Sequence, residues 1–175
     1  MSGGRPGCAV FDLDGTLVDS AGNCARVLNA MLAERGSALR LSVERTRRHM
    51  ALGGVKMVEA LLGEACGDPQ AEIGEFRRRY RAERMSASCL YPGVCEGLAR
   101  MADARVSLAV CSNKPQDLCG KTLADLQIAD LFDVVVGSRQ GFPLKPDPHL
   151  YDHALQAVGG ERAAAAMSGT TRSIS

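Results

Sequence analysis

Apolar positions recur along this chain in two patterns. Short, mostly apolar runs, which are typical of buried strands, occupy residues 8–10, 106–111 and 134–136. Between the first two runs, apolar residues at helical spacing predict helices over residues 23–35, 43–50, 55–62 and from 69 onward. After residue 91 the strands alternate with predicted helices over residues 94–103, 115–125 and 148–158. Such alternation indicates a parallel sheet with right-handed crossovers.

Local signals support the four helices that follow the first strand. Val27, Leu28 and Met31 share one face of the first of these helices. Ser42 and the Asp68–Pro69 pair are typical of helix starts, and Gly53–Gly54 breaks the chain between two helices. We therefore expect an α/β fold in which an all-helical segment is inserted after the first strand of a Rossmann-like parallel sheet.

Two carboxylates, Asp12 and Asp14, directly follow the first strand. Open α/β sheets carry out their chemistry at the carboxyl ends of strands, and Gly15 allows a sharp turn there. One carboxylate can then act as nucleophile while the other handles protons. The spacing also occurs in polar turns and in calcium loops, but a calcium loop needs Glu at its twelfth position, where this chain has Asn23.

Four ordered segments carry a family resemblance that extends from about residue 8 to residue 166. They are Phe-Asp-Leu-Asp-Gly-Thr-Leu-Val-Asp-Ser at 11–20, Tyr-Pro-Gly-Val at 91–94, Val-Ser-Leu-Ala-Val-Cys-Ser-Asn-Lys-Pro at 106–115, and Leu-Lys-Pro-Asp-Pro at 144–148. Together with Asp-Val-Val-Val-Gly at 133–137, they resemble the haloacid dehalogenase-like hydrolases, most closely the phosphoglycolate phosphatase group.

The resemblance implies a role for each candidate site residue. Asp12 would attack the phosphorus of a phosphomonoester, and Asp14 would protonate the leaving alkoxide and then deprotonate water. Both are implied ligands of Mg²⁺, which offsets the repulsion between a carboxylate and a phosphate dianion. The implied phosphate-binding residues are Thr16, Ser112, Asn113 and Lys145. Asp14 also argues against the dehalogenase branch, which lacks the second carboxylate.

Plainer interpretations of these residues stay open. Ser112 and Asn113 also suit a turn and a helix cap, and Lys145 also suits a solvated position in a Pro-rich loop. We expect Asp147 to cap a helix beginning at Pro148, and do not assign it to the metal.

The expected domains are a discontinuous catalytic core over residues 1–18 and 90–175 and a helical cap over residues 19–89. Residues 163–167 resemble the start of a further strand, but the acidic motif IV expected after it is missing, since no carboxylate follows Glu161. One codon choice for residues 167–175 with a single added G reads Met-Val-Gly-Asp-Asp-Ala-Val-Asp-Ile, so we hypothesise a frameshifted tail. We then expect the C-terminal strand and helix of the core to be missing, stability to be poor and activity to be low or absent.

Composition narrows the class of partner. The net charge of +1 argues against nucleic acid or a membrane surface as the partner, and acidic residues interrupt the arginine cluster at 77–84, as on a solvated helix face. The seven cysteines show no C-x-x-C spacing, which argues against zinc. No run has the length of a signal or membrane segment, and we expect a cytosolic, thiol-reduced protein.

The sequence thus predicts a Mg²⁺-dependent phosphatase acting on a small phosphorylated metabolite. Its cap candidates for substrate recognition are Arg47, Arg48, His49 and Lys56, each of which also suits a surface charge. A phosphosugar phosphatase or mutase and a non-catalytic remnant remain as alternatives.

Overall fold

The structure of the chain is a computed structural model, and it describes residues 7–139, 141–159 and 165–168. It forms two compact units, one comprising Met1–Asp19 and Ser86–Ser175 and the other Ser20–Met85. The expected domain borders lie at residues 18/19 and 89/90, one and four residues from the borders of these units. The assignment of the two units as catalytic core and cap stays a prediction.

The first unit contains a four-stranded sheet in the order β3-β2-β1-β4. Its strands are β1 (Cys8–Phe11), β2 (Ser107–Pro115), β3 (Val134–Ser138) and β4 (Ala165–Ser168). All three pairings are parallel, with Cys8 opposite Ser107 on one side and Ala165 on the other. The α/β class, the parallel sheet and the three predicted strands are confirmed, and β4 forms where the chain resembles the start of a further strand. Residues 169–175, which carry the frameshift hypothesis, lie outside the described residues.

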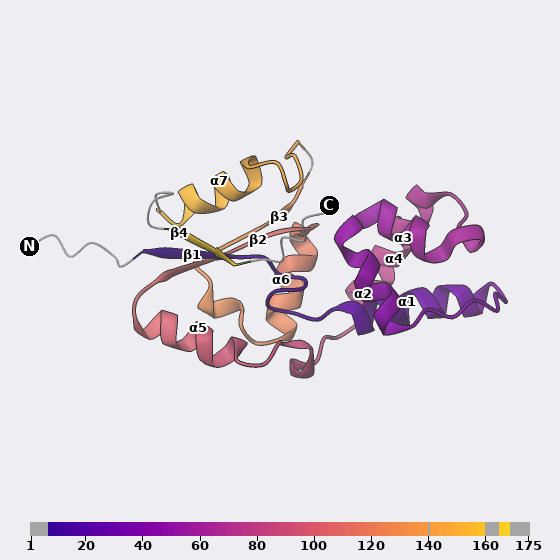
Figure 1. Cartoon of the computed structure of the whole chain (residues 1–175), viewed down its shortest axis with the longest axis horizontal. Coiled ribbons are helices and arrows are strands. Elements are labelled where there is room, and N and C mark those ends of the chain that lie inside the picture. Colours follow the sequence, from indigo (N-terminus) through magenta and orange to yellow (C-terminus); the bar gives the residue numbers. More distant parts are fainter. Residues whose placement is uncertain (1–6, 140, 160–164, 169–175) are drawn as a thin grey trace, which may run out of the picture. The chain divides into compact units, whose positions relative to one another are not determined.

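Helices cover both faces of the sheet, with α7 (His149–Ala157) on one face and α5 (Val94–Asp103) and α6 (Gln116–Asp125) on the other (Figure 1). Alternate strand residues face α7, because side chains in a strand point to opposite faces in turn. The resulting buried cluster contains Cys8, Val10, Ala109, Cys111, Val136, Leu150, Ala154, Leu155 and Val158. This packing holds β1 and β2 in place, and with them the residues that follow the two strands.

The second unit is all-helical, as predicted, with α1 (Ala21–Glu34), α2 (Val43–His49), α3 (Gly54–Leu62) and α4 (Pro69–Ala82). Ser42 accepts a hydrogen bond from the Arg45 N–H at 3.1 Å, and Asp68 accepts one from the Ala71 N–H at 2.9 Å. Both predicted helix starts are confirmed. Short 3-10 turns lie at Met50–Leu52 and Gly63–Ala65 in this unit, and at Ala87–Cys89 and Ala129–Leu131 in the first unit.

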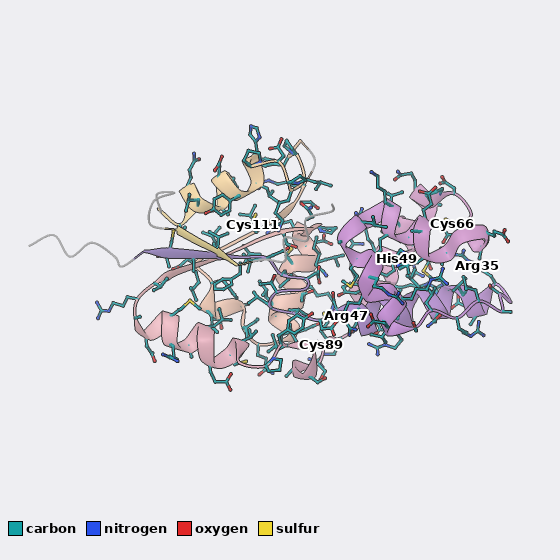
Figure 2. The ribbon with its side chains drawn as sticks, viewed as in Figure 1. Arg35, Arg47, His49, Cys66, Cys89 and Cys111 are labelled. Atoms are coloured by element: carbon teal, nitrogen blue, oxygen red, sulfur yellow. The ribbon has the colours of Figure 1, made fainter. Side chains whose placement is uncertain are left out.

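Ion pairs hold α1 and α4 of the helical unit together. Arg35 donates two hydrogen bonds to Glu72, at 2.5 and 2.6 Å, and Glu72 is only 6% exposed (Figure 2 labels Arg35). Arg79 pairs with Glu34 of α1 at 2.6 Å and with Glu75 of its own helix at 2.5 Å. Among the described residues, none of the helices is long and apolar enough to cross a membrane.

Candidate active site

The turn after β1 presents the two candidate carboxylates. Gly15 has a φ of 81°, a backbone conformation that suits glycine. Its N–H donates to the Val18 carbonyl at 2.9 Å, and the Val18 N–H donates to the Leu13 carbonyl at 3.0 Å. Leu13 is fully buried, so this tight turn is anchored in the core while Asp12 and Asp14 stay partly exposed.

Strand β2 runs past the end of β1 and brings its last residues over this turn. Phe11, the last residue of β1, lies opposite Val110, whereas β2 continues to Pro115. The sequence pattern predicted that this strand ends at residue 111, so the extension over residues 112–115 corrects that expectation. Ser112 is 2% exposed, and its hydroxyl accepts a hydrogen bond from the Lys114 N–H at 3.2 Å.

Lys145 lies against the first carboxylate. Its ammonium nitrogen is 3.0 Å from Asp12 Oδ1 and donates to the Cys111 carbonyl at 2.8 Å. The Lys145 side chain is 15% exposed, so the solvated-charge interpretation does not describe it. The same Asp12 oxygen accepts the Leu13 N–H at 2.7 Å. The predicted nucleophile and the predicted cationic residue are thus in direct contact.

Asn113 contacts the backbone of Lys145 from both ends of its amide. Its Nδ2 donates to the Lys145 carbonyl at 3.0 Å, and its Oδ1 accepts the Lys145 N–H at 2.7 Å. Such a two-way bond fixes the loop that carries the lysine to the end of β2. Asn113 therefore holds Lys145 in place, a role that the sequence did not indicate.

Lys114 contacts the second carboxylate and was not among the predicted site residues. Its Nζ donates to both Asp14 oxygens, at 2.9 and 2.8 Å. The Lys114 side chain is 8% exposed and that of Asp14 is 24% exposed. Alternation along β2 was a signal for it, since Ser112 and Lys114 lie on the same face of a strand.

Thr16 lies apart from these contacts. Its hydroxyl oxygen is buried and has no hydrogen-bond partner among the described residues. Thr16 lines a cavity of about 240 Å³ together with Tyr91, Gly97 and Met101. Its assignment to the phosphate stays a prediction.

Two thiols lie close to the site without competing as nucleophiles. Burial raises the pKa of Cys111 to about 11 and that of Cys119 to about 12 (Figure 2 labels Cys111). Both groups are neutral thiols near pH 7, and the thiolate is the reactive form of cysteine. The carboxylates are therefore the better nucleophiles here.

Asp12 and Asp14 fit Mg²⁺ as oxygen donors. Mg²⁺ in proteins is commonly held by one or two carboxylates, with water and substrate phosphate completing its shell. Among the residues that the structure describes, no group of three or more His, Cys, Asp or Glu side chains is arranged to hold a metal. Within the described residues, Asp12 and Asp14 are thus the carboxylate donors that this site offers to Mg²⁺.

Asp147 and two of the cap candidates, Arg47 and His49, have local partners. Asp147 accepts the His149 N–H at 3.0 Å, which lowers the pKa of its carboxyl. Helix α7 begins at His149 rather than at Pro148, and Pro148 stands at its cap position, so the predicted placing of Asp147 as the cap is wrong by one residue. In the helical unit Arg47 pairs with Glu44 at 2.9 Å and His49 Nδ1 lies 2.8 Å from the Arg45 carbonyl (Figure 2). A role of the cap residues in substrate recognition stays a prediction.

Comparison with known proteins identifies the family. Residues 9–172 match the haloacid dehalogenase-like hydrolase family. The chain is 31% identical to a phosphoglycolate phosphatase of Rhodobacter capsulatus, over 85% of this chain and 69% of that protein. It is 34% identical to one of Agrobacterium fabrum, over 87% and 67%. The chain spans about two thirds of the length of these relatives.

Solved structures share the fold. CbbY from Rhodobacter sphaeroides, in complex with phosphate, matches with a TM-score of 0.72 and 24% identity, over 91% of this chain and 76% of that one. A β-phosphoglucomutase from Clostridium difficile matches with a TM-score of 0.69 and 15% identity, over 91% and 74%.

The chain belongs to the haloacid dehalogenase-like hydrolases, in the phosphoglycolate phosphatase-like group. The predicted family and the enzyme class, a phosphatase, are confirmed.

Proposed function

We propose that this chain is a Mg²⁺-dependent phosphomonoesterase that works through an aspartyl-phosphate on Asp12. One observation carries the proposal: the two carboxylates of a single turn each lie against a different lysine, Asp12 against Lys145 and Asp14 against Lys114. Separate environments allow two neighbouring carboxylates to take separate roles.

The first half-reaction transfers the phosphoryl group to the protein. An Asp12 carboxylate oxygen forms a bond to phosphorus, and the bond between phosphorus and the ester oxygen breaks. Protonated Asp14 gives its proton to that oxygen, which leaves as an alcohol.

The second half-reaction restores the site. A water oxygen attacks the phosphorus and gives one proton to Asp14, and the bond between phosphorus and Asp12 breaks. Inorganic phosphate leaves, Asp12 is again a carboxylate, and Asp14 again carries the proton it lost.

The phosphate contacts in this proposal come from Lys145 and Ser112. A positive charge and a hydroxyl donor at a site of developing negative charge stabilise the transition state. The two-way bond between Asn113 and Lys145 supports an indirect role for Asn113, through the lysine it holds. When bound at Asp12 and Asp14, Mg²⁺ would offset the repulsion between the attacking carboxylate and the phosphate.

The substrate we propose is a small phosphorylated metabolite such as 2-phosphoglycolate, the substrate class that the names of the relatives support. A sugar phosphate is the second candidate, because the solved neighbours include a β-phosphoglucomutase.

All seven cysteines are free, which supports a thiol-reducing, cytosolic location.

Steady-state turnover tests this proposal. The purified chain is assayed with p-nitrophenyl phosphate, 2-phosphoglycolate and glucose 1-phosphate, with Mg²⁺ and with excess chelator. We expect Mg²⁺-dependent release of phosphate, fastest among the metabolites with 2-phosphoglycolate. It should be slower than that of the relatives, because the described part of the chain offers Mg²⁺ only the two carboxylates of Asp12 and Asp14. Asp12→Asn should abolish turnover, whereas Asp130→Asn, an exposed carboxylate of the same unit, should leave it unchanged. A folded chain without turnover would favour the non-catalytic alternative.

A further inference from the structure

The side chain of Lys114 is placed by the strand extension that the sequence did not predict. Lys114 lies beyond the end of β1, at the carboxyl edge of the sheet, and its backbone N–H donates to the hydroxyl of buried Ser112. The Lys114 carbonyl accepts a hydrogen bond from the Cys119 thiol at 3.4 Å, so the residue is tied to α6 as well. Its backbone position is therefore fixed from both sides.

The contact between Lys114 and Asp14 restricts the orientation of the carboxylate. The two Nζ–Oδ distances differ by only 0.1 Å, at 2.9 and 2.8 Å, so the ammonium bridges both oxygens. A bridged carboxylate cannot rotate about its last bond without losing one of two charge-assisted hydrogen bonds. Because Lys114 is largely buried, the pair is also less screened by water than a surface pair.

Lys145 does not duplicate this function. Among the residues that the structure describes, its ammonium contacts Asp12 Oδ1 and the Cys111 carbonyl. The site therefore assigns one lysine to the phosphoryl-transfer carboxylate and another to the proton-transfer carboxylate.

We propose that Lys114 is a positioning residue that orients Asp14 for proton transfer to the leaving group. The inference rests on the proposed function and deepens it. The step it serves breaks the bond between phosphorus and the ester oxygen, while the proton of Asp14 moves to that oxygen. One Asp14 oxygen must face the ester oxygen for this transfer, and the bridge from Lys114 to both oxygens sets the direction in which the carboxyl group faces.

The dependence of the rate on the leaving group follows from this role. An alkoxide needs a proton as it departs, whereas p-nitrophenolate is stable as an anion and needs little help. A misoriented Asp14 should thus slow the release of an alcohol far more than the release of p-nitrophenolate. General acid catalysis is typically worth about 10²–10⁴-fold, and we expect a loss of its positioning to cost about 10–100-fold.

The test measures leaving-group release in a single turnover, with the Mg²⁺-loaded chain in excess over substrate. Glycolate release from 2-phosphoglycolate is compared with p-nitrophenolate release from p-nitrophenyl phosphate. In Lys114→Met, the ratio of the two rates should fall about 10–100-fold, and Lys114→Arg, which can bridge a carboxylate, should recover most of it. Lys121→Met, which removes an ion pair to Asp125 on α6, is the matched control and should keep the ratio.

Two results would overturn the inference while leaving the proposed function intact. One is an equal loss of both rates in Lys114→Met, as a purely structural role predicts. The other is weakened inhibition by inorganic phosphate with an unchanged ratio, which would make Lys114 a phosphate ligand.

A stability cycle separates failure of the inference from failure of the proposed function. Urea unfolding is measured for Lys114→Met, Asp14→Asn and the double variant. If the double variant loses less free energy of unfolding than the two single variants lose together, the pairing of Lys114 with Asp14 is upheld. If the losses simply add, the pairing is overturned. Absence of release from both substrates by the wild-type chain would overturn the proposed function, and the cycle would still decide the pairing.

Discussion

Replacing Gly137 with alanine places a methyl group where β3 leaves no space against the end of β2 and the start of α6. A Cβ at this position would lie 2.6 Å from Gln116 Cα, 2.7 Å from Gln116 N and 2.8 Å from the Lys114 carbonyl oxygen. All three are backbone atoms, so no side chain can turn away to relieve the contact. The Gly137 N–H also donates to Gln116 Oε1 at 2.6 Å, which holds the two segments together.

The expected cost follows from the kind of atoms in contact. Overpacking a well-packed site typically costs about 1–3 kcal/mol, and rigid backbone neighbours put Gly137→Ala near the upper value, about 3 kcal/mol. Alanine also restricts the unfolded chain, which returns about 0.4–1 kcal/mol. We therefore expect a net loss of about 2 kcal/mol in the free energy of unfolding.

Urea unfolding followed by circular dichroism measures this loss, with the free energy extrapolated linearly to water. The matched control is Gly120→Ala in α6, at an exposed position where an added Cβ has no atom within 4 Å. Because alanine favours helix, this control should gain about 0.5–1 kcal/mol. A Gly137→Ala chain as stable as the wild type would refute the reasoning, since there would then be room for a methyl group between β3 and the backbone of Lys114 and Gln116.

Three further predictions concern other contacts. Asn113→Ala should raise the inhibition constant of inorganic phosphate about tenfold by releasing the Lys145 loop, an effect of about 1.4 kcal/mol; an unchanged constant would contradict it. Hydrogen bonds from Arg35 hold the pKa of Glu72 below its usual value, so its stabilisation is complete above about pH 5 and is lost as the pH falls through the folded-state pKa. Glu72→Gln should therefore show a shallower loss of stability between about pH 5 and 3 than the wild type, and equal slopes would exclude this role. Asp68→Ala should lower the free energy of unfolding by about 1 kcal/mol through loss of the α4 cap, whereas no change would show that the bond to Ala71 contributes nothing.

The sequence was sufficient to predict the main helices and strands and the approach of Lys145 to Asp12. Apolar runs and helical spacing identify strands and helices because they reflect burial on one or both faces. Asp12 and Lys145 are 133 positions apart, yet they meet because parallel strands place their carboxyl ends at one edge of the sheet. The order of the motifs along the chain was therefore enough to predict that Asp12 and Lys145 lie close together.

The parts that the sequence missed depend on polar contacts in the folded state. Ser112, Asn113 and Lys114 are turn-forming or charged residues, and a strand of such residues carries little apolar signal. The extension of β2 is stabilised instead by pairing with β3 up to Ser138 and by the bonds of Asn113 to the Lys145 loop. Lys114 was therefore overlooked, as were the bonds between the Asn113 amide and the Lys145 backbone, whereas the assignment of Asn113 to the phosphate stays a prediction.

A covalent phosphoryl group on Asp12 is the most direct test of the proposed chemistry. The Mg²⁺-loaded chain is mixed with 2-phosphoglycolate, quenched in acid within the first turnover, digested and examined by mass spectrometry. We expect one phosphoryl group on the peptide that contains Asp12, lost on longer incubation and absent from Asp12→Asn. Substrate turnover without any labelled peptide, or a label that persists in Asp12→Asn, would contradict the account.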